Sequence, residues 1–437
     1  MRKVSAYISD DLRGSFDRLN RPYKSDRENS AEILTDAIIQ PVVHHAKIQG
    51  FKRTDVGVFR KDRTYVMGSN MWMAHEEMTA QLPEYMPVAD AKFVWGGELL
   101  NHYGHFLTQS TARIYYYLQN RDKFDGILFV WLWNFGLPQY MLDFFQLAGI
   151  PLDEVKITNQ VLKVRELAVP TLSCYNCWDW TDDFLLPFKN AAEKVPAGRD
   201  KKIYLSRSAW EDHKAYVIGE KEVERAFNKN GFKSICPEKL SLAGQIAAIK
   251  GADEIAGISG TALHNILFAA GTTEKKRVIA LNRTEIMNIQ PMLDEAAGAD
   301  STTIEAYHNF IRVAHSDGPF IIGMTKHLRE FFKDNNMDDC GIKFRPERHA
   351  REFLRRYLYM YSTTEHYYDL INQKGNQIEA ADLMNLSQLA NWPKTRRAFW
   401  KIVSIVAPKK SQRIYARFKS AVLNNVISLA EKAGGGY

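Results

Sequence analysis

Cysteine is scarce in this sequence, and long apolar runs are missing from it. The 437 residues include four cysteines, too few and too widely spaced for a disulfide framework. No run of about 18 uncharged apolar residues occurs, so we expect no membrane-spanning helix. The opening residues, MRKVSAYISDDLRG, lack the apolar core of a signal peptide. These absences favour a cytoplasmic protein that forms no disulfides.

Patterns that would hold a metal ion are also few. Cys174 and Cys177 form a C-x-x-C pattern within the aromatic stretch CYNCWDW. A zinc site needs a second pair of ligands at suitable spacing, and none is evident. A redox pair would open a helix after a strand, and this stretch follows Pro170 in a different context. We therefore interpret both cysteines as packing residues.

Acidic residues are absent from one tract near the C-terminus. Between positions 394 and 419 the chain has nine basic residues and no Asp or Glu, within an overall formal charge of +7. This local excess favours an anionic partner, such as the surface of an anionic membrane. Nucleic acid is a further alternative, although the tract has no recognisable nucleic-acid-binding motif. A basic helical cap that only faces solvent is the plainer interpretation. The basic residues are Lys394, Arg396, Arg397, Lys401, Lys409, Lys410, Arg413, Arg417 and Lys419.

Strand and helix patterns alternate between residues 201 and 282. The apolar runs Ile203–Leu205, Glu254–Ile258 and Val278–Leu281 are separated by helical patterns at 219–232 and 240–250. Such alternation is typical of βαβ units and a parallel sheet. We expect an α/β domain at about residues 200–318.

The first half of the chain alternates in the same way, less regularly. Lys92–Trp95 and Ile127–Trp131 are predicted strands, with a turn at Gly96-Gly97 and a helix beginning near Tyr103. Residues 31–48 fit an amphipathic helix interrupted by Pro41. We expect an α/β domain over residues 1–190 and a helical, basic region over 319–437.

The predicted carboxyl ends of two strands carry residues suited to phosphate. Ser206-Arg207-Ser208 follows the first strand of the 200–318 domain, and Ser259-Gly260-Thr261 follows the second. Ligands of parallel sheets bind at these ends. Arginine suits a diphosphate, and a glycine turn leading into a helix presents backbone N–H groups. The alternatives are an interdomain salt bridge for Arg207 and an ordinary strand-to-helix turn.

Two residues of the first half are candidates for a general base. His105 lies between a strand end and a helix, and an imidazole titrates near neutral pH. Glu98 is the rival, just after Gly96-Gly97. Arg113 follows His105 by eight residues, about two helical turns, and would share a surface with it. Structural roles remain the alternative for each of them.

Three sequence blocks together resemble a known family. They are Tyr103-Gly104-His105-Phe106-Leu107 with Arg113; Tyr204-Leu205-Ser206-Arg207 with Glu220-Lys221-Glu222-Val223, Gly231-Phe232 and Pro237-Glu238; and Leu240-Ser241-Leu242 with Gln245, Ala252, Gly257, Gly260-Thr261-Ala262-Leu263, Asn265 and Phe268. Their order and spacing resemble glycosyltransferase family 61, which includes plant xylan-modifying enzymes, animal O-linked N-acetylglucosaminyltransferases and bacterial members annotated for capsular or exopolysaccharide synthesis.

The resemblance implies a fold and a mechanism. The fold would be GT-B, with two Rossmann-like domains facing a cleft. The enzyme would be an inverting glycosyltransferase that uses a nucleotide sugar, with UDP as the expected nucleotide, as co-substrate without a metal or other cofactor. Asp182-Asp183 and Asp338-Asp339, in loop-like contexts, are not convincing metal-binding motifs. Donor-binding residues would be Ser206, Arg207, Glu238, Ser259, Gly260, Thr261, Ala262, His264 and Asn265, while Tyr103 and Arg113 would line the acceptor side or the cleft.

Three positions depart from the family pattern. Ser259 stands where a histidine is frequent, Gln109 where an acid commonly follows the histidine of the first block, and Gly219 where asparagine is usual. These departures leave open a non-catalytic relative that binds nucleotide sugar or glycan. For an active enzyme, a glycan or lipid-linked glycan acceptor at the inner membrane face would suit the basic C-terminal helices.

Overall fold

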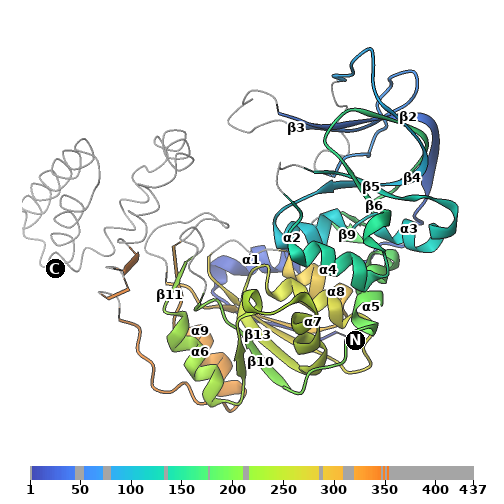
Figure 1. Cartoon of the computed structure of the whole chain (residues 1–437). Helices are drawn as coiled ribbons and strands as arrows, with labels where there is room; N and C mark the ends of the chain where they lie inside the picture. The colour runs from blue at the N-terminus through green and yellow to red at the C-terminus, as the bar shows by residue number, and fades with distance from the viewer. Residues whose placement is uncertain are drawn as a thin grey trace, which may run out of the picture.

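The structure is a computed structural model (Figure 1). It describes residues 2–353 except 45–53, 72–79, 132–135, 176–177, 210–215, 285–288, 309–318, 346–347 and 350–351. The basic tract at 394–419 and Cys177 lie outside the described residues. The anionic partner expected for the tract and the packing role expected for Cys177 therefore stay predictions. None of the helices in the described part of the chain has the length and apolarity needed to cross a bilayer.

The first sheet has six strands and is mixed. Its order is β3 (Thr54–Phe59), β2 (Ala31–His44), β7 (Leu162–Pro170), β4 (Val88–Leu99), β5 (Gly126–Trp131) and β6 (Val155–Thr158). The strands from β7 to β6 run parallel, whereas β2 runs antiparallel to both β3 and β7. The predicted strands in β4 and β5 are confirmed.

The helix predicted over residues 31–48 is wrong, because residues 31–44 form the strand β2. Residues 37–40 are all buried, so burial along the strand lacks the alternation that identifies a half-exposed strand. Pro41 lies where the pairing with β3 shifts register. A bulge of this kind accommodates a residue that has no N–H to donate.

The second sheet has six strands, all parallel. Its order is β1 (Val4–Tyr7), β15 (Asp300–Glu305), β14 (Arg277–Asn282), β13 (Glu254–Ile258), β10 (Lys202–Leu205) and β12 (Lys233–Ile235). The predicted strands in β10, β13 and β14 are confirmed. The N-terminal strand β1 pairs with β15, so residues 4–7 belong to the second sheet. The predicted domain range 1–190 had included them in the first domain.

Helices cover both faces of the second sheet. On one face, α6 (Glu220–Lys229) and α9 (Lys326–Asp334) pack against Tyr204 and Ile279. On the other, α7 (Leu242–Gly251), the 3₁₀ helix η7 (Leu263–Ala269) and α8 (Gln290–Ala296) pack against Ile203 and Val278. The predicted helices at α6 and α7 are confirmed. Ser241 caps α7, because its Oγ accepts a hydrogen bond of 3.2 Å from the N–H of Gly244.

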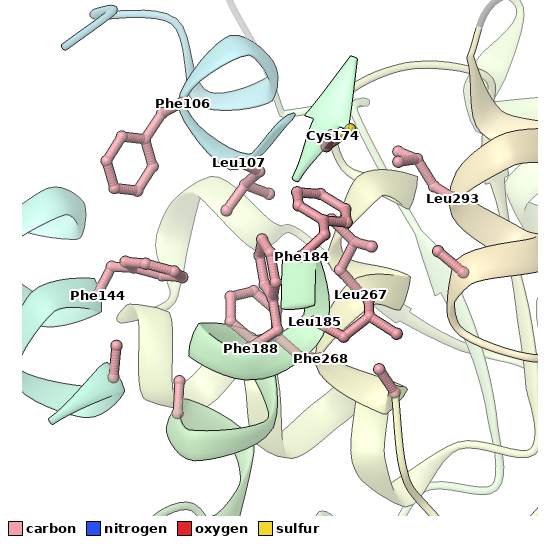
Figure 2. Close-up of a cluster of buried hydrophobic side chains, with 14 of the residues drawn as sticks. Phe106, Leu107, Phe144, Cys174, Phe184, Leu185, Phe188, Leu267, Phe268 and Leu293 are labelled. Carbon is pink, nitrogen blue, oxygen red and sulfur yellow. The ribbon is translucent and has the colours of Figure 1, made fainter. Parts of the chain in front are cut away.

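The two sheets share one continuous apolar core. Helices α4 (Gln139–Ala148) and α5 (Leu186–Glu193) lie between the sheets in Figure 1 and contact α7 and η7. Figure 2 shows this core, in which the Phe268 ring lies 6.2 Å from Phe144 and 5.4 Å from Phe188, centroid to centroid. A large apolar interface opposes independent domain motion, so we expect the two halves to keep one relative orientation.

Candidate active site

Three neighbouring strands of the second sheet end side by side. Leu205 of β10 pairs with Gly257 of β13, and Ile258 of β13 pairs with Leu281 of β14. Because these strands are parallel, the residues that follow them lie along one edge of the sheet. This edge therefore carries Ser206-Arg207, then Ser259-Gly260-Thr261, then Arg283, and the structure brings the two predicted phosphate-binding segments together.

The segment with Arg207 is held by carboxylates of helix α6. The Arg207 N–H donates to Glu220 Oε1 at 2.7 Å, and Ser206 Oγ donates to Glu224 Oε2 at 3.0 Å. Glu220 is 1% exposed, and burial raises its pKa to about 8, against the opposing effect of Arg207. Glu220 is therefore protonated in part at neutral pH, so it offsets the positive charge of Arg207 less than a fully ionised carboxylate would.

The short helix α2 (Tyr103–His105) packs directly on the loop after β13. A Cβ atom on Gly104 would lie 2.5 Å from Thr261 Cγ2 and 3.1 Å from His264 Nδ1. Only glycine allows this approach without displacing the loop. The first block of the sequence thus contacts the third, across the boundary between the two sheets.

Gly104→Ala is expected to lower the free energy of unfolding by about 1–3 kcal/mol, the usual cost of overpacking a filled contact. The urea midpoint of unfolding measures this change. Gly136→Ala is the matched control, because no atom lies within 4 Å of the Cβ it would add. Equal stability of the two variants would contradict the close contact between Gly104 and Thr261.

A hydrogen-bonded chain joins the same two blocks. Tyr103 Oη donates to Asn265 Oδ1 at 2.5 Å, and Asn265 Nδ2 donates to Gln245 Oε1 at 2.9 Å. Asn265 is 1% exposed. Both ends of its side chain are thus engaged by the protein itself, which places Asn265 and Tyr103 in the contact between the two halves.

Two histidines flank α2, with His102 just before its first residue and His105 as its last. The rings of His102 and His105 are 4.6 Å apart, and His102 Nδ1 accepts from the N–H of His105 at 3.4 Å. Desolvation lowers the pKa of both imidazoles. The charges of His105 and Arg207 lower the pKa of His102 further. The side chain of Gln109 raises the pKa of His105 in part. His105 is therefore neutral near pH 7, the form that accepts a proton.

The segment that gathers these residues matches a known family. The family model "Glycosyltransferase 61" matches residues 103–284, from α2 to the end of β14. The chain carries a glycosyltransferase 61 domain. It is therefore a glycosyltransferase, as the sequence blocks predicted. A comparison with curated proteins found no match.

Glu98 and Arg113 of the glycosyltransferase are enclosed in its first half. They are 1% and 0% exposed. Glu98 Oε1 accepts from the N–H of Met71 at 3.2 Å, and Arg113 donates to the carbonyl groups of Gly68 and Pro170. Burial raises the pKa of Glu98, and Arg113 opposes the rise. This pair holds residues 68–71 against the first sheet, which favours His105 over Glu98 as the base.

The remaining predicted donor residues line the same edge. Ser259 is 5% exposed and its N–H donates to the Leu281 carbonyl at 2.8 Å, while His264 is 7% exposed. Thr261 and Ala262 are half-buried, and Glu238 is exposed in the turn after β12. Among the residues that the structure describes, no group of three His, Cys, Asp or Glu side chains is placed to hold a metal ion.

Sequence reasoning missed two residues of this region, His102 and Arg283. His102 immediately precedes the first block, and its side chain caps α2. A single histidine between a strand and a helix does not reveal such a cap in the sequence. Arg283 comes two residues after the apolar run of β14, just as Arg207 comes two residues after the run of β10. The rule that led to Arg207, a cation just after a parallel strand, would have found Arg283 too.

Proposed function

We propose that this glycosyltransferase is an inverting enzyme that moves a sugar from a nucleotide sugar, with UDP as the nucleotide, to a glycan acceptor. One observation carries the proposal: Gly104 packs against Thr261 and His264, so the candidate base is next in sequence to a residue that touches the donor loop. A base and an anion-binding edge at one place are what a direct displacement needs.

The proposed reaction is a single displacement at the anomeric carbon. The acceptor oxygen forms the new bond to that carbon while the bond to the diphosphate oxygen breaks. His105 takes the proton of the acceptor hydroxyl, and the diphosphate leaves with the bonding electron pair. Arg207 and the backbone N–H groups of Gly260 and Thr261 stabilise the charge that develops on the diphosphate. This assignment gives no step to a metal or cofactor.

The proposal includes an arrangement of domains. The second sheet, with the strand β1 added, would be the Rossmann-like donor domain of residues 200–318, and residues up to 190 would form the acceptor side. Together they would make the GT-B cleft. The support is that the carboxyl ends of β10, β13 and β14 carry the donor candidates, and that α2 faces them from the other half.

A cellular role in capsular or exopolysaccharide synthesis belongs to the same proposal. The acceptor would be a glycan or lipid-linked glycan, and the basic region within 319–437 would hold the enzyme at the inner membrane face. The support is the tract of nine basic residues without an acid between positions 394 and 419. Anionic lipid attracts each such residue near its surface by about 1 kcal/mol.

A thermal-shift screen of nucleotides and nucleotide sugars, run with and without EDTA, tests the donor assignment. The proposal predicts that UDP and a UDP-sugar raise the melting temperature equally in both conditions. Stabilisation that disappears with EDTA would contradict the metal-independent mechanism. Stabilisation by no nucleotide would contradict the donor site itself.

Gln109→Glu is expected to move the acidic limb of the pH–rate profile to higher pH. A carboxylate beside His105 stabilises the imidazolium and so raises its pKa. The base acts in its neutral form, so a higher pKa means that activity is lost at a higher pH as the solution is acidified. In the wild type, desolvation lowers the pKa of His105, so activity is expected to persist below the pH at which an ordinary histidine becomes protonated. Identical acidic limbs in both proteins would show that His105 is not the titrating base.

The second candidate function is a non-catalytic protein that binds nucleotide sugar or glycan. Ser259 and Gln109 favour it, because the family pattern has ionisable residues at both positions. Binding of UDP without release of UDP from any UDP-sugar, with or without acceptor, would support this alternative.

A further inference from the structure

Arg283 lies at the donor edge, on the opposite side of the glycine loop from Arg207. It follows β14, whose Leu281 pairs with Ile258 of β13, so it lies beside the loop that starts at Ser259. A Cβ on Gly260 would lie 3.9 Å from Arg283 Nη1. The guanidinium is thus in van der Waals reach of the loop backbone.

The surroundings of Arg283 hold its guanidinium in a fixed plane. Its central carbon lies 4.3 Å from the centroid of the Phe320 ring, and the residue is 8% exposed. Phe320 is itself fully buried in β16 (Phe320–Ile321), which pairs with β11 (Val217–Ile218). A guanidinium stacked on a ring directs its N–H groups outward in its own plane. In this direction they can donate to the oxygen atoms of a carboxylate or phosphate.

The spacing of the strands sets the distance between the two arginines. β10 and β14 lie on either side of β13, so their ends are two strand spacings apart, about 10 Å. An extended arginine side chain is long enough to cross about half of such a gap. A diphosphate carries more negative charge than one guanidinium neutralises, and two phosphates offer each arginine a separate partner.

We propose that Arg283 is a second phosphate-binding residue of the donor site, which holds the nucleotide diphosphate from the side opposite Arg207. The loop Ser259-Gly260-Thr261 follows β13, which lies between the two strands that carry the arginines, and Gly260 places no side chain beside Arg283. This inference rests on the proposed function, because it takes the donor to be a nucleoside diphosphate sugar.

Calorimetric titration of UDP, UMP and inorganic pyrophosphate into wild type and Arg283→Met tests the proposal. Methionine keeps much of the side-chain length and removes the charge. Loss of charge-assisted hydrogen bonds is expected to weaken UDP and pyrophosphate binding by about 10- to 100-fold. UMP, with one phosphate, loses less, so the preference for UDP over UMP falls.

The chain offers a matched control in Arg277 at the other end of β14. Its guanidinium also stacks on a phenylalanine, with 5.4 Å between its central carbon and the Phe331 ring, and it lies at the edge away from the loop. Arg277→Met is expected to leave UDP affinity unchanged. Arg283→Lys, which keeps the charge without the planar fork, should show a smaller loss than Arg283→Met with a melting temperature near wild type.

The outcomes separate this inference from the function on which it rests. Wild type that binds neither UDP nor pyrophosphate overturns the donor site and the role of Arg283 together. Wild type that binds UDP, with Arg283→Met and Arg283→Lys binding it equally well, overturns the role of Arg283 alone. A lower melting temperature of Arg283→Met with unchanged UDP affinity has the same meaning, because Arg283 then serves only to hold β16.

Discussion

His105→Ala is expected to lower kcat for UDP release by about 10²- to 10⁴-fold, the range that general base catalysis contributes. The imidazole is neutral near pH 7 because desolvation lowers its pKa, so it is ready to take a proton from the acceptor. Its helix packs on the donor loop through Gly104, which puts it next to the reacting carbon in the proposed complex. The affinity for UDP should stay close to wild type, because His105 does not hold the diphosphate.

Glu98→Gln is the comparison that makes this result decisive. The side chains of glutamate and glutamine are nearly isosteric, and Glu98 is enclosed with Arg113 inside the first half. We expect Glu98→Gln to retain kcat within the same order of magnitude. A larger loss for Glu98→Gln than for His105→Ala, at equal thermal stability, would reverse the assignment of the base.

Arg207→Ala is expected to weaken UDP binding by about 100-fold or more. Two charge-assisted hydrogen bonds to phosphate contribute about 1.5–3 kcal/mol each, and each 1.4 kcal/mol is a tenfold change in affinity. Burial raises the pKa of Glu220 to about 8, so this neighbour offsets the charge of the arginine only in part at neutral pH. Calorimetric titration of UDP measures the effect directly.

The control for Arg207 is Arg199, an exposed arginine just before the amino end of the same strand. Arg199→Ala is expected to bind UDP like wild type, and Arg207→Lys should lie between the two because lysine lacks the planar fork. Equal UDP affinity of Arg207→Ala and Arg199→Ala would mean that Arg207 does not bind the diphosphate. Arg207 would then serve in an interdomain salt bridge, the alternative that the sequence left open.

Strand prediction succeeded where a short apolar run was bounded by turns. The runs in β10, β13 and β14 have this form. It failed at β2, whose consecutive buried residues hide the alternation. It also placed a turn at Gly96-Gly97, inside β4. There, a Cβ on Gly96 would lie 2.3 Å from the Phe129 ring, and Gly97 has φ +91° beside a register shift. Both glycines serve close packing within a strand.

The site could be predicted only where local rules apply. A cation or a glycine turn after a parallel strand is a local signal, and it led to Arg207 and Gly260. The contact of Tyr103 with Asn265 joins residues 162 positions apart, and no local pattern specifies it. Asn265 looked like a donor ligand in the sequence, yet its amide bonds to Tyr103 and Gln245. We interpret part of the family pattern as the contact that holds the two halves together.

The stereochemistry of donor hydrolysis tests the central claim most directly. Purified enzyme is incubated with an α-linked UDP-sugar and water as the acceptor, and the anomeric proton of the released sugar is followed by NMR before mutarotation. A single displacement predicts that the β anomer appears first, with release slowed by about 100-fold or more in His105→Ala. First appearance of the α anomer would contradict the inverting mechanism, and UDP binding without any release would contradict catalysis.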